Sequence, residues 1–233
     1  MKNIFRRFRK KQKEDIKVID MPSTPTQFKI GIIGVGCGGC NIINLMYDLK
    51  FPRDSLMVCD MDKSVLKRSK VKNKLQIGDK GLGGGNIPEE GKLAAKRELG
   101  KIKEYLNTNF ECVIIITCLG GGCGTGVSPI VAHVAKGLGL TTIAVVTHPF
   151  HFEGNVKRTR ALECEKELAE CCDALFSFNN ESMTIEGNSG SIIDAFIDSD
   201  KVKINIIKYF IEYQRLHPDS IKDKSTHFHF WKP

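Results

Sequence analysis

Five of the seven residues from 120 to 126 are glycine, and this stretch limits what the chain can fold into more than any other. It follows the apolar run ECVIIIT (111–117) and precedes SPIVAHVAKGLG (128–139), in which Ser128 and Pro129 are typical of a helix start. Glycine loses more backbone freedom on folding than any other residue, so the cluster destabilises a fold unless the backbone must approach something closely. The sequence therefore predicts a strand, a bare backbone loop and a helix, in that order.

Apolar runs and helical segments alternate through most of the chain. Runs that are apolar on both faces are typical of strands in a buried parallel sheet. With 233 residues, of which 41% are hydrophobic, the chain is long enough to bury such a sheet. The predicted fold class is α/β, with a doubly wound, mostly parallel sheet and helices on both faces. Strands are expected at 28–35, 55–60, 74–77, 111–117, 140–149 and 174–178, and helices at 41–50, 88–106, 128–139, 154–171, 190–197 and 200–216.

Glycine-rich segments follow predicted strands at three places. The first glycine segment, GVGCGGCN (34–41), contains Gly-x-Gly-x-x-Gly, and Asp60 ends the next strand. This is the context of a dinucleotide-binding fingerprint, which taken alone favours a nicotinamide-dependent oxidoreductase. The second glycine segment is GDKGLGGGNIPEEG (78–91), and the third is residues 120–126. All three are expected at the carboxyl ends of the strands, where ligands bind in parallel sheets.

Three glycine segments are more than one dinucleotide needs. They predict one ligand with several phosphates, held by backbone N–H groups from several directions. The third segment also leads into a predicted helix, whose free N–H groups and dipole favour an anion. The chain has no GxxxxGK[ST] motif, which excludes a Walker-type phosphate loop.

The nine cysteines lie mostly in apolar or helical runs, which is typical of reduced thiols in a cytosol. Cys37 and Cys40 form a CxxC, which is compatible with a metal or redox site. No second CxxC or histidine pair lies nearby, so we expect no metal site. No apolar run reaches 18 residues, and no long apolar stretch follows the basic N-terminus, so neither a membrane-spanning helix nor a secretory signal is expected.

Residues 1–13 are rich in Lys and Arg and contain no acid, so most of the formal net charge of +8 belongs to this tail. A nucleic-acid partner is therefore not expected for the folded part. As a helix, the tail would place Ile4, Phe5 and Phe8 on one face, which is the pattern of a short anchor on anionic lipid. The alternative is a solvated basic tail, joined to the rest by a linker at 14–27.

The third glycine segment, GGGCGTG, resembles the motif GGGTG[ST]G of the tubulin/FtsZ family. IGVGCGGCNIINLM (33–46) is similar to the first phosphate loop of that family, and GLGGGNIPEEG (81–91) resembles its loop near the γ-phosphate. AVVTHPFHFEG (144–154) is close to the FtsZ form AVVTKPFxFEG, and DAF (194–196) also recurs there. These motifs occur in the family order across residues 29–216, and they resemble bacterial FtsZ more than tubulin.

The resemblance implies a tubulin/FtsZ-type nucleotide-binding domain for GTP or GDP, with Mg²⁺ as a further candidate on the side of Asp62. Phe196 would stack on guanine, and Asp200 would accept from its N1–H and 2-amino group, since a carboxylate offers only acceptors. Lys157 takes the place of a family arginine, with Arg158 beside it as a substitute. The implied nucleotide-binding residues are Gly36, Cys37, Gly38, Gly39 and Asn41 at the α- and β-phosphates; Gly84, Gly85 and Asn86 near the γ-phosphate; Asp62; Gly120, Gly121, Gly122, Cys123, Gly124, Thr125 (through its hydroxyl) and Gly126 around the remaining phosphate oxygens; and Glu153, Lys157, Arg158, Asn180, Phe196 and Asp200 at the sugar and base.

The sequence departs from the family pattern at two places. Cys123 stands where the motif has Thr, and because a thiol is a poor donor, weaker phosphate binding is expected. The family loop GxxNxDxxD is replaced by HPDSIKDKS (217–225), which leaves Asp219 and Asp223 as the catalytic candidates. In this family, the acids of one subunit act on the nucleotide of the next, so GTPase activity stays undecided. One reading is a GTP-binding, FtsZ-like cytoskeletal protein of cell division that assembles with like subunits. The other is a non-catalytic modulator or cap of FtsZ filaments.

The expected organisation is a basic tail and linker at 1–27, a GTP-binding domain at 28–199, a long core helix at 200–216, and an end at 217–233 without the family's second domain. Without that domain, part of the long helix is expected to be exposed. The expected location is the cytoplasm, with the inner face of the membrane or the division site as an option.

Overall fold

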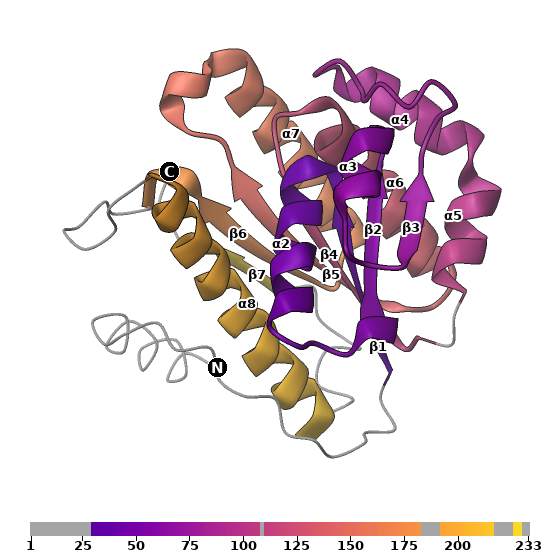
Figure 1. The fold of residues 1–233 in the computed structure, drawn as a ribbon, viewed down its shortest axis with the longest axis vertical. Helices are drawn as coiled ribbons and strands as arrows, with labels where there is room; N and C mark the ends of the chain where they lie inside the picture. The colour runs from indigo at the N-terminus through magenta and orange to yellow at the C-terminus, as the bar shows by residue number, and fades with distance from the viewer. Residues whose placement is uncertain (1–28, 108–109, 183–191, 217–225, 230–233) are drawn as a thin grey trace.

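All seven strands of the sheet run parallel in the computed structural model, which describes residues 29–107, 110–182, 192–216 and 226–229 (Figure 1). Neighbouring strands are parallel throughout, which confirms the predicted fold class. The final strand was not expected from the sequence. In spatial order the strands are β3 (Asn73–Gln76), β2 (Leu56–Asp60), β1 (Ile30–Val35), β4 (Cys112–Cys118), β5 (Thr141–His148), β6 (Ala174–Asn179) and β7 (Thr226–His229).

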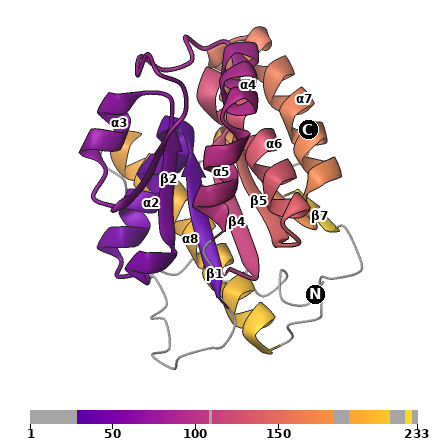
Figure 2. The ribbon, with the colours of Figure 1, turned by 90° about the vertical axis from the view of Figure 1, so that its right-hand side faces the viewer.

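Helices cover both faces of this sheet, as Figure 2 shows from the side. One face packs against α4 (Pro88–Arg97), α5 (Leu99–Leu106), α6 (Gly122–Gly137) and α7 (Asn155–Cys171). The other face packs against α2 (Gly36–Asp48), α3 (Lys63–Arg68) and α8 (Ile192–Leu216). Because β1, β2, β4 and β5 are buried along their length, their continuous apolar runs supply both cores.

Two helices begin earlier than the sequence predicts. Helix α6 begins at Gly122, so the predicted N-cap role of Ser128 is wrong; its hydroxyl instead donates to the carbonyl of Gly124 at 2.6 Å. Pro129 lies inside the helix and has no N–H for the carbonyl of Thr125, which accepts from the Cys164 thiol at 3.2 Å. Helix α2 likewise begins at Gly36 rather than at 41. Two of the glycine segments are therefore the first turns of helices.

Two other helix predictions also need correction. The helix expected at 88–106 is divided at Glu98, where α4 ends and α5 begins. The two helices expected at 190–197 and 200–216 are one helix, α8. The ion pair of Lys201 with Asp198, spaced i,i+3, joins the residues of the expected break to the helix that follows, and Lys203 pairs with Asp200 just after it.

The isoleucines in the middle of α8 are buried rather than exposed, whereas Val202, Tyr209 and Phe210 are partly buried. Ile204, Ile206, Ile207 and Ile211 belong to the core on this face of the sheet. Among the α8 side chains that the structure describes, the exposed large apolar ones are Ile193, Phe196 and Ile197, near the N-terminal end. No helix in the described part of the chain is long and apolar enough to cross a membrane.

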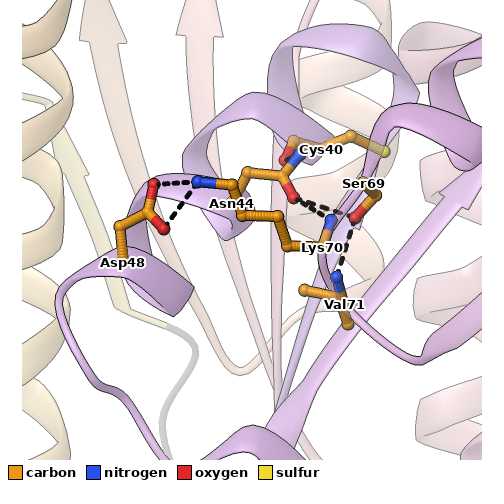
Figure 3. Close-up of polar contacts among 6 residues, drawn as sticks. All are labelled: Cys40, Asn44, Asp48, Ser69, Lys70 and Val71. Atoms are coloured by element: carbon orange, nitrogen blue, oxygen red, sulfur yellow. Dashed lines mark hydrogen bonds and ion pairs between the residues drawn. The ribbon is translucent and has the colours of Figure 1, made fainter.

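Polar contacts hold α2 against the turn between α3 and β3 (Figure 3). The Asn44 side chain donates to the carbonyl of Cys40 at 2.9 Å and accepts from the Ser69 hydroxyl at 2.9 Å and the Lys70 backbone N–H at 3.0 Å. Lys70 also pairs with Asp48 at 2.7 Å. These contacts fix the direction of α2, whose N-terminus carries the first glycine segment.

Candidate functional site

The three glycine segments meet at the carboxyl edge of the sheet. A Cβ on Gly36 would lie 2.9 Å from the backbone nitrogen of Gly124, so the first segment packs directly against the third. A Cβ on Gly84 would lie 3.2 Å from the carbonyl carbon of Gly122, so the second segment packs there too. Segments that are far apart in sequence therefore form one continuous surface of backbone.

Some of these glycines are required by helix packing. A Cβ on Gly126 would lie 2.1 Å from the carbonyl oxygen of Pro88, and one on Gly91 would lie 2.5 Å from the carbonyl oxygen of Gly122. Helices α4 and α6 thus cross with their backbones in contact, which only glycine allows. The close approach inferred from the sequence is therefore partly an approach of helix to helix.

Other glycines leave room for a ligand. Nothing lies within 4 Å of a Cβ placed on Gly85, and the nearest atom to one on Gly121 is the Asn86 side-chain oxygen at 3.9 Å. Gly120 has φ of +98°, and its N–H donates to the Thr125 hydroxyl at 2.8 Å, which holds the turn into α6. The Thr125 hydroxyl keeps its own proton for another acceptor.

The N-termini of α2 and α6 lie side by side at this edge. Neither helix has a side-chain cap, and neither has an acid in its first turn. Their N-terminal N–H groups and dipoles thus lie close together, with no side-chain cap among the described residues, which favours an anion. Within the first segment, Cys37 and Asn41 are exposed, while Gly36 and Gly39 are buried.

The two cysteines of the CxxC face different surroundings. Cys37 is exposed, whereas the Cys40 thiol is buried and donates to the carbonyls of Gly34 and Cys59 at 3.6 and 3.7 Å. Burial raises the pKa of both thiols, most strongly that of Cys40. All nine cysteines are free thiols. Within the described residues, no group of three or more His, Cys, Asp or Glu side chains is arranged to hold a metal ion.

Asp60, the acid of the dinucleotide fingerprint, is buried with 3% of its surface exposed. One of its oxygens accepts from the Asp62 backbone N–H at 2.9 Å, and burial raises its pKa. Cys123 is also buried, beside Asp60 and Met61, and burial raises the pKa of its thiol. The carboxylate expected to bind the ribose of a nicotinamide cofactor is thus buried and accepts a hydrogen bond from the protein backbone. The Cys123 side chain lies beneath the third segment rather than on its surface.

Asp62 lies beside the second segment, and Asn86 lies within it. Asp62 caps α3 by accepting from the Ser64 N–H at 2.7 Å, and hydrogen bonds to Ser64 lower the pKa of this carboxyl. It also pairs with Leu82 in an isolated β-bridge, which brings it to the second segment. Asn86 has φ of +58°, and its carbonyl accepts from Arg160 at 2.7 Å.

Arg160 was not among the residues expected from the sequence. It lies on α7, and positions 153, 157 and 160 have the i, i+4, i+7 spacing of residues on one face of a helix. This spacing was the sequence signal that could have placed Arg160 with Glu153 and Lys157. The Glu153 carboxylate accepts from the Phe150 N–H at 2.9 Å and pairs with Lys157 at 3.0 Å. A Cβ on Gly120 would lie 3.2 Å from Lys157, so Lys157 borders the third segment, whereas Arg158 is exposed.

Of the residues expected at the sugar and base, Asn180 directly follows β6, and Phe196 and Asp200 lie on α8. The Phe196 ring packs edge-on against Phe150, with centroids 5.8 Å apart, and is 39% exposed. The Asn180 side-chain oxygen is buried and has no hydrogen-bond partner among the described residues. Asp200 pairs with Lys203 at 2.9 Å. The catalytic candidates Asp219 and Asp223, like the basic tail, lie outside the described residues.

A parallel sheet bearing three glycine segments at one edge defines a nucleotide-binding type of α/β fold. The model of the Tubulin/FtsZ family, GTPase domain, matches residues 29–186. The chain belongs to the tubulin/FtsZ family.

Curated relatives and solved structures agree with this assignment. The cell division protein FtsZ of Aquifex aeolicus is 42% identical over 178 residues, covering 75% of this chain and 48% of that protein. FtsZ of Azotobacter vinelandii is 39% identical over 190 residues, covering 80% of this chain and 48% of that protein. An empty FtsZ dimer from M. jannaschii has a TM-score of 0.72 at 34% identity, covering 81% of this chain and 55% of that one. CetZ2 from Haloferax volcanii shares the fold, with a TM-score of 0.72 at 19% identity. The chain thus spans about half the length of the curated relatives it matches.

Proposed function

We propose that this chain binds GTP or GDP across the carboxyl edge of its sheet, as the nucleotide-binding part of an FtsZ-like cytoskeletal protein of cell division. The observation that carries the proposal is the meeting of the three glycine segments, with Gly36 against Gly124 and Gly84 against Gly122. A single turn explains one glycine segment, but three that share one surface fit a ligand with several phosphates.

The phosphates are proposed to lie at the N-termini of α2 and α6. Both helices leave their first N–H groups uncapped, and neither has an acid there to repel an anion. Gly121 and Gly85 have space for close approach of a phosphate to the backbone. Asn86, whose carbonyl accepts a hydrogen bond from Arg160, borders the place expected for the γ-phosphate.

The sugar and base are proposed to lie between α7 and the start of α8. Asn180 brings a buried oxygen without a partner among the described residues, which suits a donor on the ligand. The partly exposed Phe196 offers a ring for stacking. Asp200 offers acceptors to the N1–H and 2-amino group of guanine, whereas adenine has no donor at N1.

Mg²⁺ fits the same site through the nucleotide. This ion keeps several waters and is commonly held by phosphates and one or two carboxylates. Asp62 lies beside the second glycine segment, and its lowered pKa keeps it ionised near neutral pH. It is the carboxylate that would hold the ion or its waters.

Nucleotide hydrolysis is the open part of the proposal. We propose that the chain assembles with like subunits or with FtsZ-like filament subunits, and that hydrolysis depends on acids brought by a neighbour. Residues 217–225 carry Asp219 and Asp223 but not the spacing of the family loop, which favours a binding role as a modulator or cap over catalysis. The basic tail at 1–13 is proposed to contact an anionic membrane surface from the cytoplasmic side.

The test is direct binding of GTP, ATP and NAD to the purified chain by calorimetry, followed by phosphate release. We expect GTP to bind and ATP and NAD to bind at least about 10-fold more weakly, because a carboxylate contact is worth about 1.5–3 kcal/mol. Asp200→Asn should reverse the preference toward XTP, whose base has a carbonyl where guanine has its 2-amino group. Preference for NAD, or no binding of GTP, would refute the proposal.

Phosphate release then separates the two forms of the proposal. Release that rises with protein concentration would mean that the chain self-associates and supplies an acid to its neighbour. Tight GTP binding without release would support the modulator or cap.

A further inference from the structure

Lys203 is a buried lysine beneath the proposed base site. Only 3% of its side chain is exposed, and its ammonium group donates to Asp200 Oδ1 at 2.9 Å. Lysine is almost never fully buried unless it is paired, because desolvation of the ammonium is costly. Asp200 itself is 21% exposed, so one end of this ion pair reaches the surface and the other does not.

The Lys203–Asp200 pair lies among few other titratable groups that act on it within the described residues. Among the described groups, Cys118 at the end of β4 is influenced by both Lys203 and Asp200, and it is in turn influenced by Cys37. Burial raises the pKa of Cys118 to about 11, so this thiol is neutral near pH 7. Among the described residues, Lys203 is the charged group that acts on the Asp200 carboxyl.

We infer that Lys203 is a positioning residue for base recognition, which holds Asp200 as an oriented carboxylate facing the guanine. This inference rests on the proposed function, because it assigns a role within the same site. The hydrogen bond from Lys203 occupies one acceptor position on Asp200 Oδ1. The remaining acceptor positions of the carboxylate are left for the N1–H and 2-amino donors of guanine.

The charge of Asp200 decides what it can recognise. Burial raises the pKa of this carboxyl, and Lys203 acts in the opposite direction. A protonated carboxyl would present its own O–H toward one of the two guanine donors, so recognition is present above the pKa and is lost as the pH falls through it. Removing Lys203 raises the pKa of Asp200 and moves that loss toward neutral pH.

The chain provides a matched control on the same helix. Lys201 pairs with Asp198 at 2.9 Å with the same i,i+3 spacing, but 31% of the lysine and 43% of the aspartate side chain are exposed. Lys201→Met removes an equivalent charge from α8 without changing the contact to Asp200. Any general effect of charge on nucleotide binding should therefore be the same in Lys201→Met and Lys203→Met.

The experiment compares the affinities for GTP and ITP from pH 6 to pH 8 in the wild type and both variants. The two nucleotides share their triphosphate, and ITP lacks only the 2-amino group, so their ratio cancels the titration of the phosphates. We expect the wild type and Lys201→Met to prefer GTP by about 10-fold at every pH, the size of one hydrogen bond to a charged group. Lys203→Met should keep that preference at pH 8 and show a smaller preference at pH 6, because the pKa of Asp200 is higher without the lysine.

Lys203→Arg should restore the wild-type profile, because it restores the charge. Lys203→Gln replaces the methionine variant if the latter does not fold, since it keeps a polar end without the charge. A ratio for Lys203→Met or Lys203→Gln that matches the wild type at every pH overturns the inference while GTP binding stands. Failure of the wild type to bind GTP at pH 8 instead overturns the proposed function, and the inference with it.

Discussion

The glycines of the third segment should separate into two experimental classes, and Gly126 is the clearest member of the first. A Cβ at Gly126 would lie 2.1 Å from the Pro88 carbonyl oxygen and 2.7 Å from the Lys92 backbone nitrogen. Ordinary van der Waals contact begins at 3.4 Å, so α4 would have to move away from α6 by more than 1 Å. Both obstacles are backbone atoms, which no rotamer change can remove.

The expected cost of Gly126→Ala follows from two opposing effects. Alanine in a helix is favoured over glycine by about 1 kcal/mol. Overpacking against fixed backbone costs about 1–3 kcal/mol and occasionally more, and this contact is at the severe end. We expect a net loss of about 2 kcal/mol in the free energy of unfolding, which lowers Tm by roughly 4–8 °C in a chain of this size.

Gly137→Ala is the control, because it lies in the same helix and nothing is within 4 Å of its added Cβ. Its stability should equal or exceed that of the wild type by up to about 1 kcal/mol. Gly121→Ala represents the second class, because its Cβ would enter the space proposed for phosphate. It should unfold like the wild type and bind GTP about 10-fold more weakly, the loss of one charge-assisted hydrogen bond.

Urea unfolding followed by circular dichroism measures the first effect, and calorimetric titration with GTP measures the second. Gly126→Ala as stable as Gly137→Ala would refute the backbone contact between α4 and α6. Gly121→Ala that binds GTP like the wild type would refute the placement of the phosphates. Equal loss of stability in Gly121→Ala and Gly126→Ala would mean that the two classes do not exist.

Three further predictions concern single side chains. Arg160→Met should weaken binding of GTP about 3- to 10-fold and of GDP less, because the bond to the Asn86 carbonyl orders the segment expected at the γ-phosphate; equal losses in calorimetry would contradict this. Asp60→Asn should raise the urea midpoint at pH 7, because burial raises the pKa of Asp60 and its negative charge destabilises the fold above the ordinary aspartate pKa of 3.8. This gain in the midpoint should shrink as the pH falls from 7 to 4. A gain that does not depend on pH would contradict a buried charge. Cys37 is the exposed cysteine of the described residues, so iodoacetamide should label it first, faster as the pH rises toward 9, and GTP should slow the labelling; mass spectrometry that finds Cys40 labelled at the same rate would contradict the structure.

Much of the fold was predictable because the strands are apolar on both faces. Runs such as those of β1, β4 and β5 have few other uses than the interior of a parallel sheet, and their ends are within two residues of the predicted ones. Helix starts were predicted less well. Glycine is typical of loops, yet Gly36 and Gly122 are the first residues of helices. These positions are glycine because the neighbouring backbone lies too close for any side chain.

The candidate site was predictable as a set of segments but not as a set of contacts. The glycine motifs pointed to the carboxyl edge of the sheet and supplied most of the residues expected to bind the phosphates. They did not show that Cys123 faces the core beside Asp60, or that Arg160 reaches Asn86. Those contacts join residues from different segments, and local sequence patterns carry no information about which segments lie side by side.

The sequence by itself determined the parallel sheet, the edge at which its glycine segments gather and the family to which the chain belongs, because apolar runs and short motifs are local properties. Only the tertiary structure decided which glycines separate two helices and which leave room for a ligand. It also decided that the Asp60 carboxylate is bonded to the backbone of Asp62, and that Lys203 is buried and paired with Asp200. The physical reason is that burial and distance, which set the charge and the accessible surface of a side chain, depend on segments that meet only when the chain folds.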